Sequence, residues 1–258
     1  MRKRLIPLTG LAAAGALLLA ACGSSDDAPT SQIFEAPTWN GPERVTYDLL
    51  YEGGDLYGYC TLETEPDGDT TTVRRMCTDP DGEGHRDDGM AVIDSETLRP
   101  LESQRVVTRA DEHTETTFSG SYDEDSAYLT FEQVNLDTHQ VEDAFDTDRE
   151  LPEPTEESPE PGYYDDESLF WLVRGIPLEE GFEGAYHNIN LGIARIVVAE
   201  VTVEEQETIE VPAGEYDTWR VRLQTASVTQ RLWVDTEEPH RVIQAEIEDL
   251  TYALRSYD

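Results

Sequence analysis

Lysine is almost missing from this chain of 258 residues, in which Lys3 is the only one. The remaining cations are arginines, and the 18 Lys and Arg residues face 56 Asp and Glu residues. Such an excess of negative charge repels the phosphates of nucleic acids and the headgroups of anionic lipids, so we exclude both as binding surfaces. A high-salt habitat and a GC-rich genome that favours arginine codons would each explain the missing lysine, and both explanations stay open.

Long apolar runs are scarce too, and the clearest one, residues 5–21, follows the basic start Arg2-Lys3-Arg4. This run is too short for a membrane-spanning helix and ends in small residues, which is typical of a secretory signal peptide over residues 1–21. Its end, Leu-Ala-Ala followed by Cys22, resembles the bacterial lipobox, whose cysteine receives a diacylglyceryl group and acyl chains such as palmitate. The alternative is an ordinary signal peptide with an accidental cysteine.

The lipobox resemblance implies an extracytoplasmic lipoprotein that Cys22 anchors to the cell membrane, or to the outer membrane if the cell has one. Residues 22–43 are polar and contain Pro29, Pro37 and Pro42, so we expect a flexible tether there. Removal of residues 1–21 takes away three cations and no acid, which leaves 15 arginines against 56 acids and a net charge of −41.

Cysteine is the third scarce residue, with three in the chain. Apart from Cys22 there are Cys60 and Cys77, an even pair in a chain that we expect to enter an oxidising compartment. A hairpin with its turn at Gly68-Asp69 places Cys60 directly opposite Cys77 on the same face, a geometry that accepts a disulfide. Free buried thiols or a redox pair are the alternatives, although no Cys-x-x-Cys motif or neighbouring histidine indicates an activated thiolate.

The rest of the chain shows the period-two alternation of half-buried strands. We expect strands near residues 45–52, 56–62, 71–78, 90–94, 101–109, 113–122, 126–134, 193–203, 218–223, 228–234 and 241–247. One helix is expected at residues 168–174, capped by Asp165 or Asp166 and stopped by Gly175 and Pro177. Residues 146–167 combine prolines with many acids, which predicts a mobile acidic surface loop.

These patterns predict a mostly β protein with a single domain over residues 44–258. Its fold class would be a curled antiparallel sheet, a half-barrel or open barrel of about ten strands, with one mid-chain helix packed on it.

Signals for chemistry are few. No Gly-x-Ser-x-Gly elbow and no dinucleotide-binding glycine motif occur, so we expect no catalytic residue and no cofactor site. The five histidines are scattered, which argues against zinc. Asp79, Asp81 and Glu83 occupy the first, third and fifth positions of a calcium loop, but Met90 stands where the twelfth should supply a carboxylate, so a solvated turn is favoured.

Aromatic residues at strand spacing are the remaining signal. They are Tyr47 and Tyr51, Tyr57 and Tyr59, Phe118 and Tyr122, and Trp219 and Trp233. The simpler interpretation is core packing of a curved sheet. The alternative is an apolar groove inside the curl that holds an apolar ligand.

The C-terminal half carries a resemblance. Val211-Pro212-Ala213-Gly214, followed by Tyr216-Asp217-Thr218, resembles a motif of exported bacterial proteins that share a domain of unknown function. The helix at residues 166–174 and the strand Leu232-Trp233-Val234-Asp235 fit the same family. The resemblance covers roughly residues 44–255, implies a fold similar to the curved sheets of lipoprotein carriers, and implies no activity. The acidic segment 146–167 departs from it.

Two functions are therefore compatible with the sequence. The first is a non-enzymatic cell-envelope lipoprotein that binds or scaffolds, with the membrane and an apolar small molecule as its partners. The second is an envelope glycan hydrolase with a carboxylate pair that the sequence does not reveal. Two close, buried acids of unequal pKa in a concave groove would favour the hydrolase, and an apolar lumen with few acids would favour the binding module.

Overall fold

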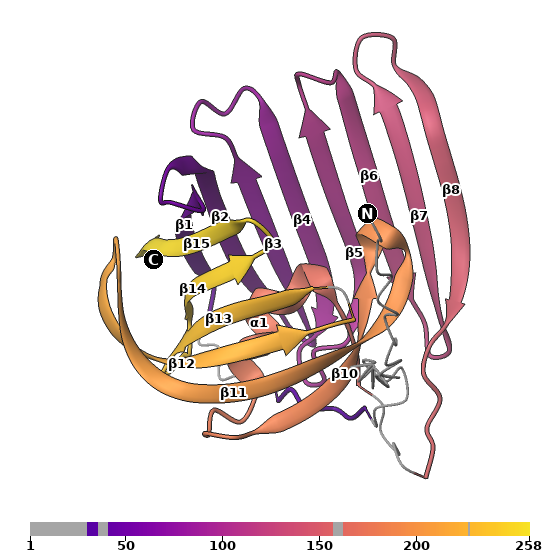
Figure 1. Ribbon diagram of the computed structural model, residues 1–258. Coiled ribbons are helices and arrows are strands. Elements are labelled where there is room, and N and C mark those ends of the chain that lie inside the picture. Colours follow the sequence, from indigo (N-terminus) through magenta and orange to yellow (C-terminus); the bar gives the residue numbers. More distant parts are fainter. Residues whose placement is uncertain (1–29, 36–40, 157–161, 227) are drawn as a thin grey trace, which may run out of the picture.

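The structure is a computed structural model that describes residues 30–35, 41–156, 162–226 and 228–258 (Figure 1). Within these residues, one sheet of 15 strands curls on itself in the order β8-β7-β6-β5-β4-β3-β2-β1-β15-β14-β13-β12-β11-β10-β9. All neighbouring strands pair antiparallel except β9 and β10. The predicted mostly β, open, curled sheet is thus confirmed.

The first half of the sheet is a meander in which each strand pairs with the next one in the sequence. Its strands are β1 (Glu43–Tyr51), β2 (Leu56–Asp67), β3 (Thr70–Thr78), β4 (His85–Asp94), β5 (Pro100–Arg109), β6 (Thr114–Tyr122), β7 (Ser126–Asn135) and β8 (Gln140–Glu150).

The second half starts with a short strand and a helical segment and continues as another meander. Its elements are β9 (Tyr163–Asp165), η1 (Asp166–Ser168), α1 (Leu169–Leu172), η2 (Val173–Gly175), β10 (Glu183–Asn190), η3 (Leu191–Ile193), β11 (Arg195–Val211), β12 (Gly214–Gln224), β13 (Thr229–Asp235), β14 (Val242–Ile247) and β15 (Leu250–Tyr257). Pairing of β15 with β1 joins the halves, while β8 and β9 remain as edges, so the barrel is open.

The predicted strand number of about ten is wrong. The strands that the pattern missed include β8, where 9 of 11 residues are exposed and no alternation marks an inner face. The short buried β9 and strands β10 and β15 were also missed. Alternation reveals a strand only where one of its faces is covered.

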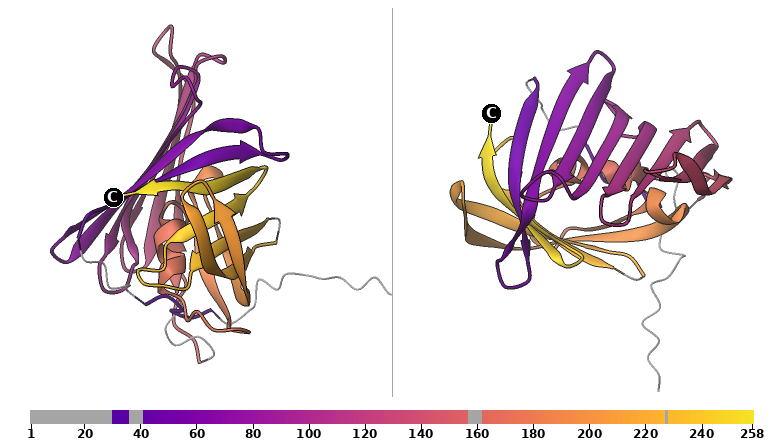
Figure 2. Two further views of the ribbon diagram at one scale, coloured as in Figure 1. Left: turned by 90° about the vertical axis from the view of Figure 1, so that its left-hand side faces the viewer. Right: turned by 90° about the horizontal axis from the view of Figure 1, so that it is seen from above.

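The predicted helix is confirmed, although it is short. Helical turns run from η1 through α1 to η2, and the Asp165 side chain caps them by accepting a hydrogen bond from the Glu167 amide. Seen from above, this segment lies inside the curl, between the two halves of the sheet (Figure 2). Leu172 and Val173 are fully buried there.

Packing around the helical segment forms the main core. Inward residues of both halves contribute to it, among them Val45, Leu49, Val201, Leu232 and Leu254. Two buried hydrogen bonds connect distant elements: the Tyr47 hydroxyl donates to the Val242 carbonyl at 2.7 Å, and the Trp171 indole donates to the Thr64 hydroxyl. The helical segment thus fills the space between the two halves, with Phe170 against Tyr47 of β1 and Tyr252 of β15, and with η1 against β4 and β5.

The predicted flexible tether of residues 22–43 needs correction for residues 30–35. This segment lies against the second half, where the Ser31 amide donates to the Ala185 carbonyl at 3.0 Å. Phe34 is 1% exposed and packs edge-on against Tyr164 and Tyr186. Ile33 and Phe34 are the apolar pair in this polar stretch, and burial of their side chains holds the segment in place.

The predicted acidic loop of residues 146–167 is also too long. Residues 146–150 belong to β8, and residues 163–168 form β9 and η1. Of the remainder, residues 157–161 lie outside the described part of the chain. The acidic residues suggested a loop, but β8 is an edge strand whose mostly solvated side chains can be acidic without disrupting the strand.

Candidate functional site

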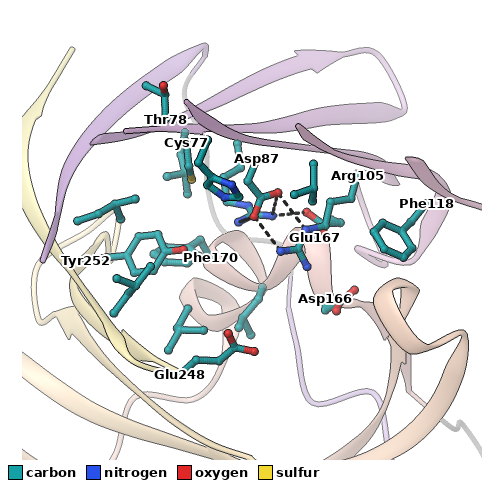
Figure 3. A pocket seen from close by; sticks show the side chains of 18 of the residues that line it. Cys77, Thr78, Asp87, Arg105, Phe118, Asp166, Glu167, Phe170, Glu248 and Tyr252 are labelled. Atoms are coloured by element: carbon teal, nitrogen blue, oxygen red, sulfur yellow. Dashed lines mark hydrogen bonds and ion pairs between the residues drawn. The ribbon is translucent and has the colours of Figure 1, made fainter. Parts of the chain in front are cut away.

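The inside of the curl holds a cavity of about 570 Å³ (Figure 3). Both halves of the sheet and the helical segment line it. The lining includes Leu49, Leu62, Arg75, Asp87, Arg105, Val107, Phe118 and Phe131 from β1–β7, Asp166, Glu167, Leu169 and Phe170 from the helical segment, and Ile247, Leu250 and Tyr252 from β14 and β15. Apolar and aromatic side chains therefore share the lining with polar and charged side chains, including the acids Asp87, Asp166, Glu167 and Glu248.

A second cavity of about 370 Å³ adjoins the first. Both are lined by Arg105, Asp166, Leu169, Asn190, Gln230 and Glu248, so they meet at these residues. The second cavity continues toward apolar residues of β11, Val197 and Ala199. Together the two cavities can accept a ligand that is longer than either one.

Two arginines and two carboxylates meet at the cavity wall (Figure 3). Arg105 donates to both carboxylate oxygens of Asp87, from Nε at 2.9 Å and from Nη2 at 2.8 Å. Arg75 donates from Nη2 to Glu167 Oε2 at 3.0 Å and to Asp87 at 3.3 Å. Burial alone would raise the pKa of Asp87, but the two arginines hold it below its ordinary value.

Gly89 makes this arrangement sterically possible. It lies between the two arginines in the sheet, paired with Arg75 on one side and with Arg105 on the other. A Cβ at this position would collide with Glu167 Oε2. The missing side chain lets the Glu167 carboxylate reach the sheet, which ties the helical segment to β3.

Behind this network lies a fully buried carboxyl group, that of Asp165. It accepts hydrogen bonds from the Ser103 hydroxyl at 2.7 Å, from the Tyr122 hydroxyl and from the Glu167 amide. Burial and the neighbouring charge of Glu167 raise the pKa of Asp165 to about 7, and the hydrogen bonds oppose part of this shift. Asp165 lines neither of the two cavities.

Asp166 is the acid that faces the junction of the two cavities. Burial raises its pKa well above the ordinary value, and the charges of Asp165 and Glu167 raise it further. Its carboxylate lies 3.5 Å from the backbone amide of Leu191, which donates to it. Asp165 and Asp166 therefore form a pair with raised pKa values, of which one member is enclosed and the other is open to the groove.

The predicted disulfide between Cys60 and Cys77 is present. The two residues are paired across β2 and β3 in the expected register, with the turn at Gly68-Asp69. Cys77 lines the larger cavity, so the disulfide fixes part of its wall. Cys22 lies outside the described residues, and its lipidation stays a prediction.

The calcium-loop segment forms a tight turn in which the Asp79 side chain accepts hydrogen bonds from the backbone amides of Gly84 and His85, at 2.9 and 3.3 Å. In the described part of the chain, no group of three or more His, Cys, Asp or Glu side chains is placed to hold a metal ion.

No helix among the same residues is long and apolar enough to cross a membrane.

The sequence predicted the disulfide and the curl but missed the charged network. Arg75 and Arg105 occupy inward positions of strands whose other inward residues are mostly apolar or small, such as Val73 and Val107. A charged residue at an inward position is the signal that could have found them. Of the aromatic pairs, Tyr47 belongs to the core, while Tyr57 and Phe118 line the cavity.

Comparison with known families identifies a match over most of the chain. The model of a family described as "Protein of unknown function (DUF3108)" matches residues 46–250. The chain belongs to this family. The predicted membership of a family without an assigned function is thereby confirmed, and the match spans the strands and the helical segment that build the cavity. No curated protein matches the chain.

Solved structures with similar folds are distant in sequence. A β-barrel-like protein from Brucella abortus with a domain named DUF1849 is 11% identical, with a TM-score of 0.48 over 84% of this chain and 97% of that chain. A candidate lipoprotein from Parabacteroides distasonis is 10% identical, with a TM-score of 0.34 over 88% and 99% of the two chains. A candidate exported protein from Bacteroides fragilis with a YmcC-like fold is 10% identical, with a TM-score of 0.31 over 88% and 99%.

Proposed function

We propose that this DUF3108 protein is an extracytoplasmic lipoprotein that binds a partly apolar small molecule inside its curled sheet. The observation that carries the proposal is the pair of adjoining cavities, about 570 and 370 Å³, whose lining combines apolar and aromatic side chains with polar and charged ones. Ligand sites are concave and combine apolar and aromatic side chains with polar groups that fix the orientation of the ligand. The basic start, the apolar run and Cys22 support export and lipid anchoring.

The state of the acids favours binding over catalysis. Asp87 and Glu167 are paired with arginines, and Asp165 is enclosed. The arginines lower the pKa of Asp87, which makes this carboxylate a poor general base. The charged network therefore has the character of a rigid support for the cavity wall.

The second candidate remains an envelope glycan hydrolase, and one observation favours it. Asp166, with its raised pKa, and Glu248 both line the two cavities. Glycoside hydrolysis uses one protonated and one ionised carboxyl group on opposite sides of the substrate. Hydrolysis of envelope glycans by the wild type, lost in Asp166→Asn and in Glu248→Gln, would support this function against simple binding.

A cavity-filling experiment tests the binding proposal. Val107 points into the larger cavity, whereas its neighbour Val106 lies on the opposite face of β5. We expect wild type to bind the neutral fluorophore N-phenyl-naphthylamine saturably, Val107→Trp to weaken this binding about tenfold by filling the cavity, and Val106→Trp to leave it unchanged. Absence of saturable binding by wild type, or equal affinities in both variants, would contradict the proposal.

The anchor is tested separately. Cys22→Ser should release the exported protein from membranes into the soluble extracytoplasmic fraction, because this variant has no thiol at position 22 to receive the lipid. Retention of this variant on the membrane at the wild-type level would show that the lipobox interpretation is wrong.

A further inference from the structure

A single row of residues crosses the inner face of the sheet from the charged network to the open edge. In register, Arg105 of β5 is paired with Phe118 of β6, Phe118 with Phe131 of β7, and Phe131 with Phe145 of β8. The ring centroids are 5.3 Å apart between Phe118 and Phe131 and 5.1 Å apart between Phe131 and Phe145, where the rings stack. We call Phe118, Phe131 and Phe145 the aromatic row.

The aromatic row is continuous with the cavity but is not enclosed by it. Phe118 and Phe131 line the larger cavity, whereas Phe145 stands on the edge strand and is 45% exposed. Exposure of an aromatic ring next to two others is unfavourable by about 25 cal/mol for each Å² in contact with water. Three aligned rings therefore offer an apolar surface that an elongated chain would cover.

A cation stands at the inner end of this row. Arg105 lies beside Phe118 (Figure 3), lines both cavities, and has a side chain that is 32% exposed. Its bonds to Asp87 use Nε and Nη2, so the Nη1 group is not part of that ion pair. At the outer end, Asp143 and Arg149 both lie on the face of Phe145 along β8.

We propose that the ligand of this groove is an amphiphile with one anionic group, bound with that group at Arg105 and its apolar chain along the aromatic row. A cation followed by three rings is complementary in charge and polarity to such a molecule. Arg105 at the inner end, whose Nη1 group is outside the ion pair with Asp87, sets the direction. From β5 to β8 the row spans about 14 Å, three strand spacings, so the bound chain is long.

This inference rests on the proposed function and is tested by matched ligands. Dodecanoate and its methyl ester share a chain and differ in charge, while hexanoate keeps the charge on a chain too short for the row. Wild type should bind dodecanoate about tenfold more tightly than the ester, because only the acid forms a charge-assisted hydrogen bond with Arg105. Arg105→Gln should remove this preference.

Matched variants separate the two ends of the ligand. Arg86→Gln makes the same charge change at an outward position of β4, and should keep the preference for dodecanoate over the ester. Phe145→Ala should weaken the binding of dodecanoate several-fold and leave the binding of hexanoate unchanged. Tyr128→Ala removes a ring of similar exposure, 42%, from the other face of β7 and should change neither affinity.

Equal affinity of wild type for dodecanoate and its ester would overturn the assignment of the anionic end. An unchanged dodecanoate affinity in Phe145→Ala would overturn the assignment of the aromatic row. If neither molecule binds while N-phenyl-naphthylamine still binds, this inference fails and the proposed function stands. If the neutral fluorophore also fails to bind, the proposed function fails with it.

Discussion

Strands β2 and β8 have nearly the same length and opposite surroundings. Along β2, alternate residues from Gly58 to Thr64 are buried, because the helical segment and the second half of the sheet cover its inner face. Along β8, 9 of 11 residues are exposed, and the inner face is open around Phe145. One sheet thus has a covered part, which supplies stability, and an uncovered part, which is free to meet a ligand.

The covered part contains buried ion pairs beside its apolar contacts, and the two adjacent arginines of β3 test how much these pairs contribute to stability. The side chains of Arg75 and Glu167 are 14% and 3% exposed, whereas Arg74 pairs with Glu65 on the outer face at 38% and 57%. We expect Arg75→Met to lower the free energy of unfolding by about 3 kcal/mol, because the buried Glu167 loses its hydrogen-bonded partner and keeps only the longer contact with Arg105, at 4.0 Å. Arg74→Met should cost less than about 1 kcal/mol.

Urea unfolding at neutral pH measures both variants. Equal losses of the free energy of unfolding in the two variants would contradict this prediction. They would show that the buried ion pair of the inner face stabilises the protein no more than the exposed pair of the outer face.

Acid should stabilise the covered part over the range in which Asp165 titrates. The pKa of Asp165 is raised to about 7, above its value in the unfolded chain, so the folded state binds more protons between about pH 4 and pH 7. The free energy of unfolding therefore falls as the pH rises through this range, and one such carboxyl group gives a slope of at most about 1.4 kcal/mol per pH unit. Asp166, with its raised pKa, contributes in the same direction.

Asp165→Asn should flatten this dependence, since an amide accepts the capping hydrogen bond from Glu167 without titrating. Asp87, whose pKa is lowered, stabilises the fold above the unfolded value and loses its contribution at lower pH, so it does not produce the same slope. Thermal unfolding of both proteins between about pH 4 and pH 8 checks the prediction. If the free energy of unfolding has the same dependence on pH in wild type and in Asp165→Asn, then groups other than Asp165 take up the protons on folding.

The same contrast explains what the sequence could predict. The alternation of apolar and polar residues identified β2 and β3, and with the turn at Gly68-Asp69 it placed Cys60 opposite Cys77. This worked because burial of one face of a strand requires apolar or small side chains at every second position. It failed for β8, where no burial constrains the side chains. Arg75, Arg105 and Glu167 come together across strands and the helical segment, and no spacing along the chain encodes that contact.

The uncovered part should respond to salt more than the covered part. Strand β8 carries Asp146, Asp148 and Glu150 at alternate positions, which places like charges side by side on one face. Their repulsion is screened as the Debye length falls from about 10 Å at 0.1 M to about 3 Å at 1 M ionic strength. With 56 acids in the chain, the melting temperature should also rise with salt, as long-range repulsion weakens.

Hydrogen exchange resolves the two parts. Local opening of an exposed edge strand costs less than opening of a covered strand, so β8 amides should exchange faster than those of β2. Added sodium chloride should slow exchange in β8 by a factor corresponding to less than about 1 kcal/mol, and slow it less in β2. A non-ionic osmolyte at equal water activity is the control, because it stabilises by exclusion without screening charge. If salt and osmolyte slow β8 equally, or if the melting temperature stays flat, the acids of this strand are already compensated, and genome composition becomes the better explanation for the missing lysine.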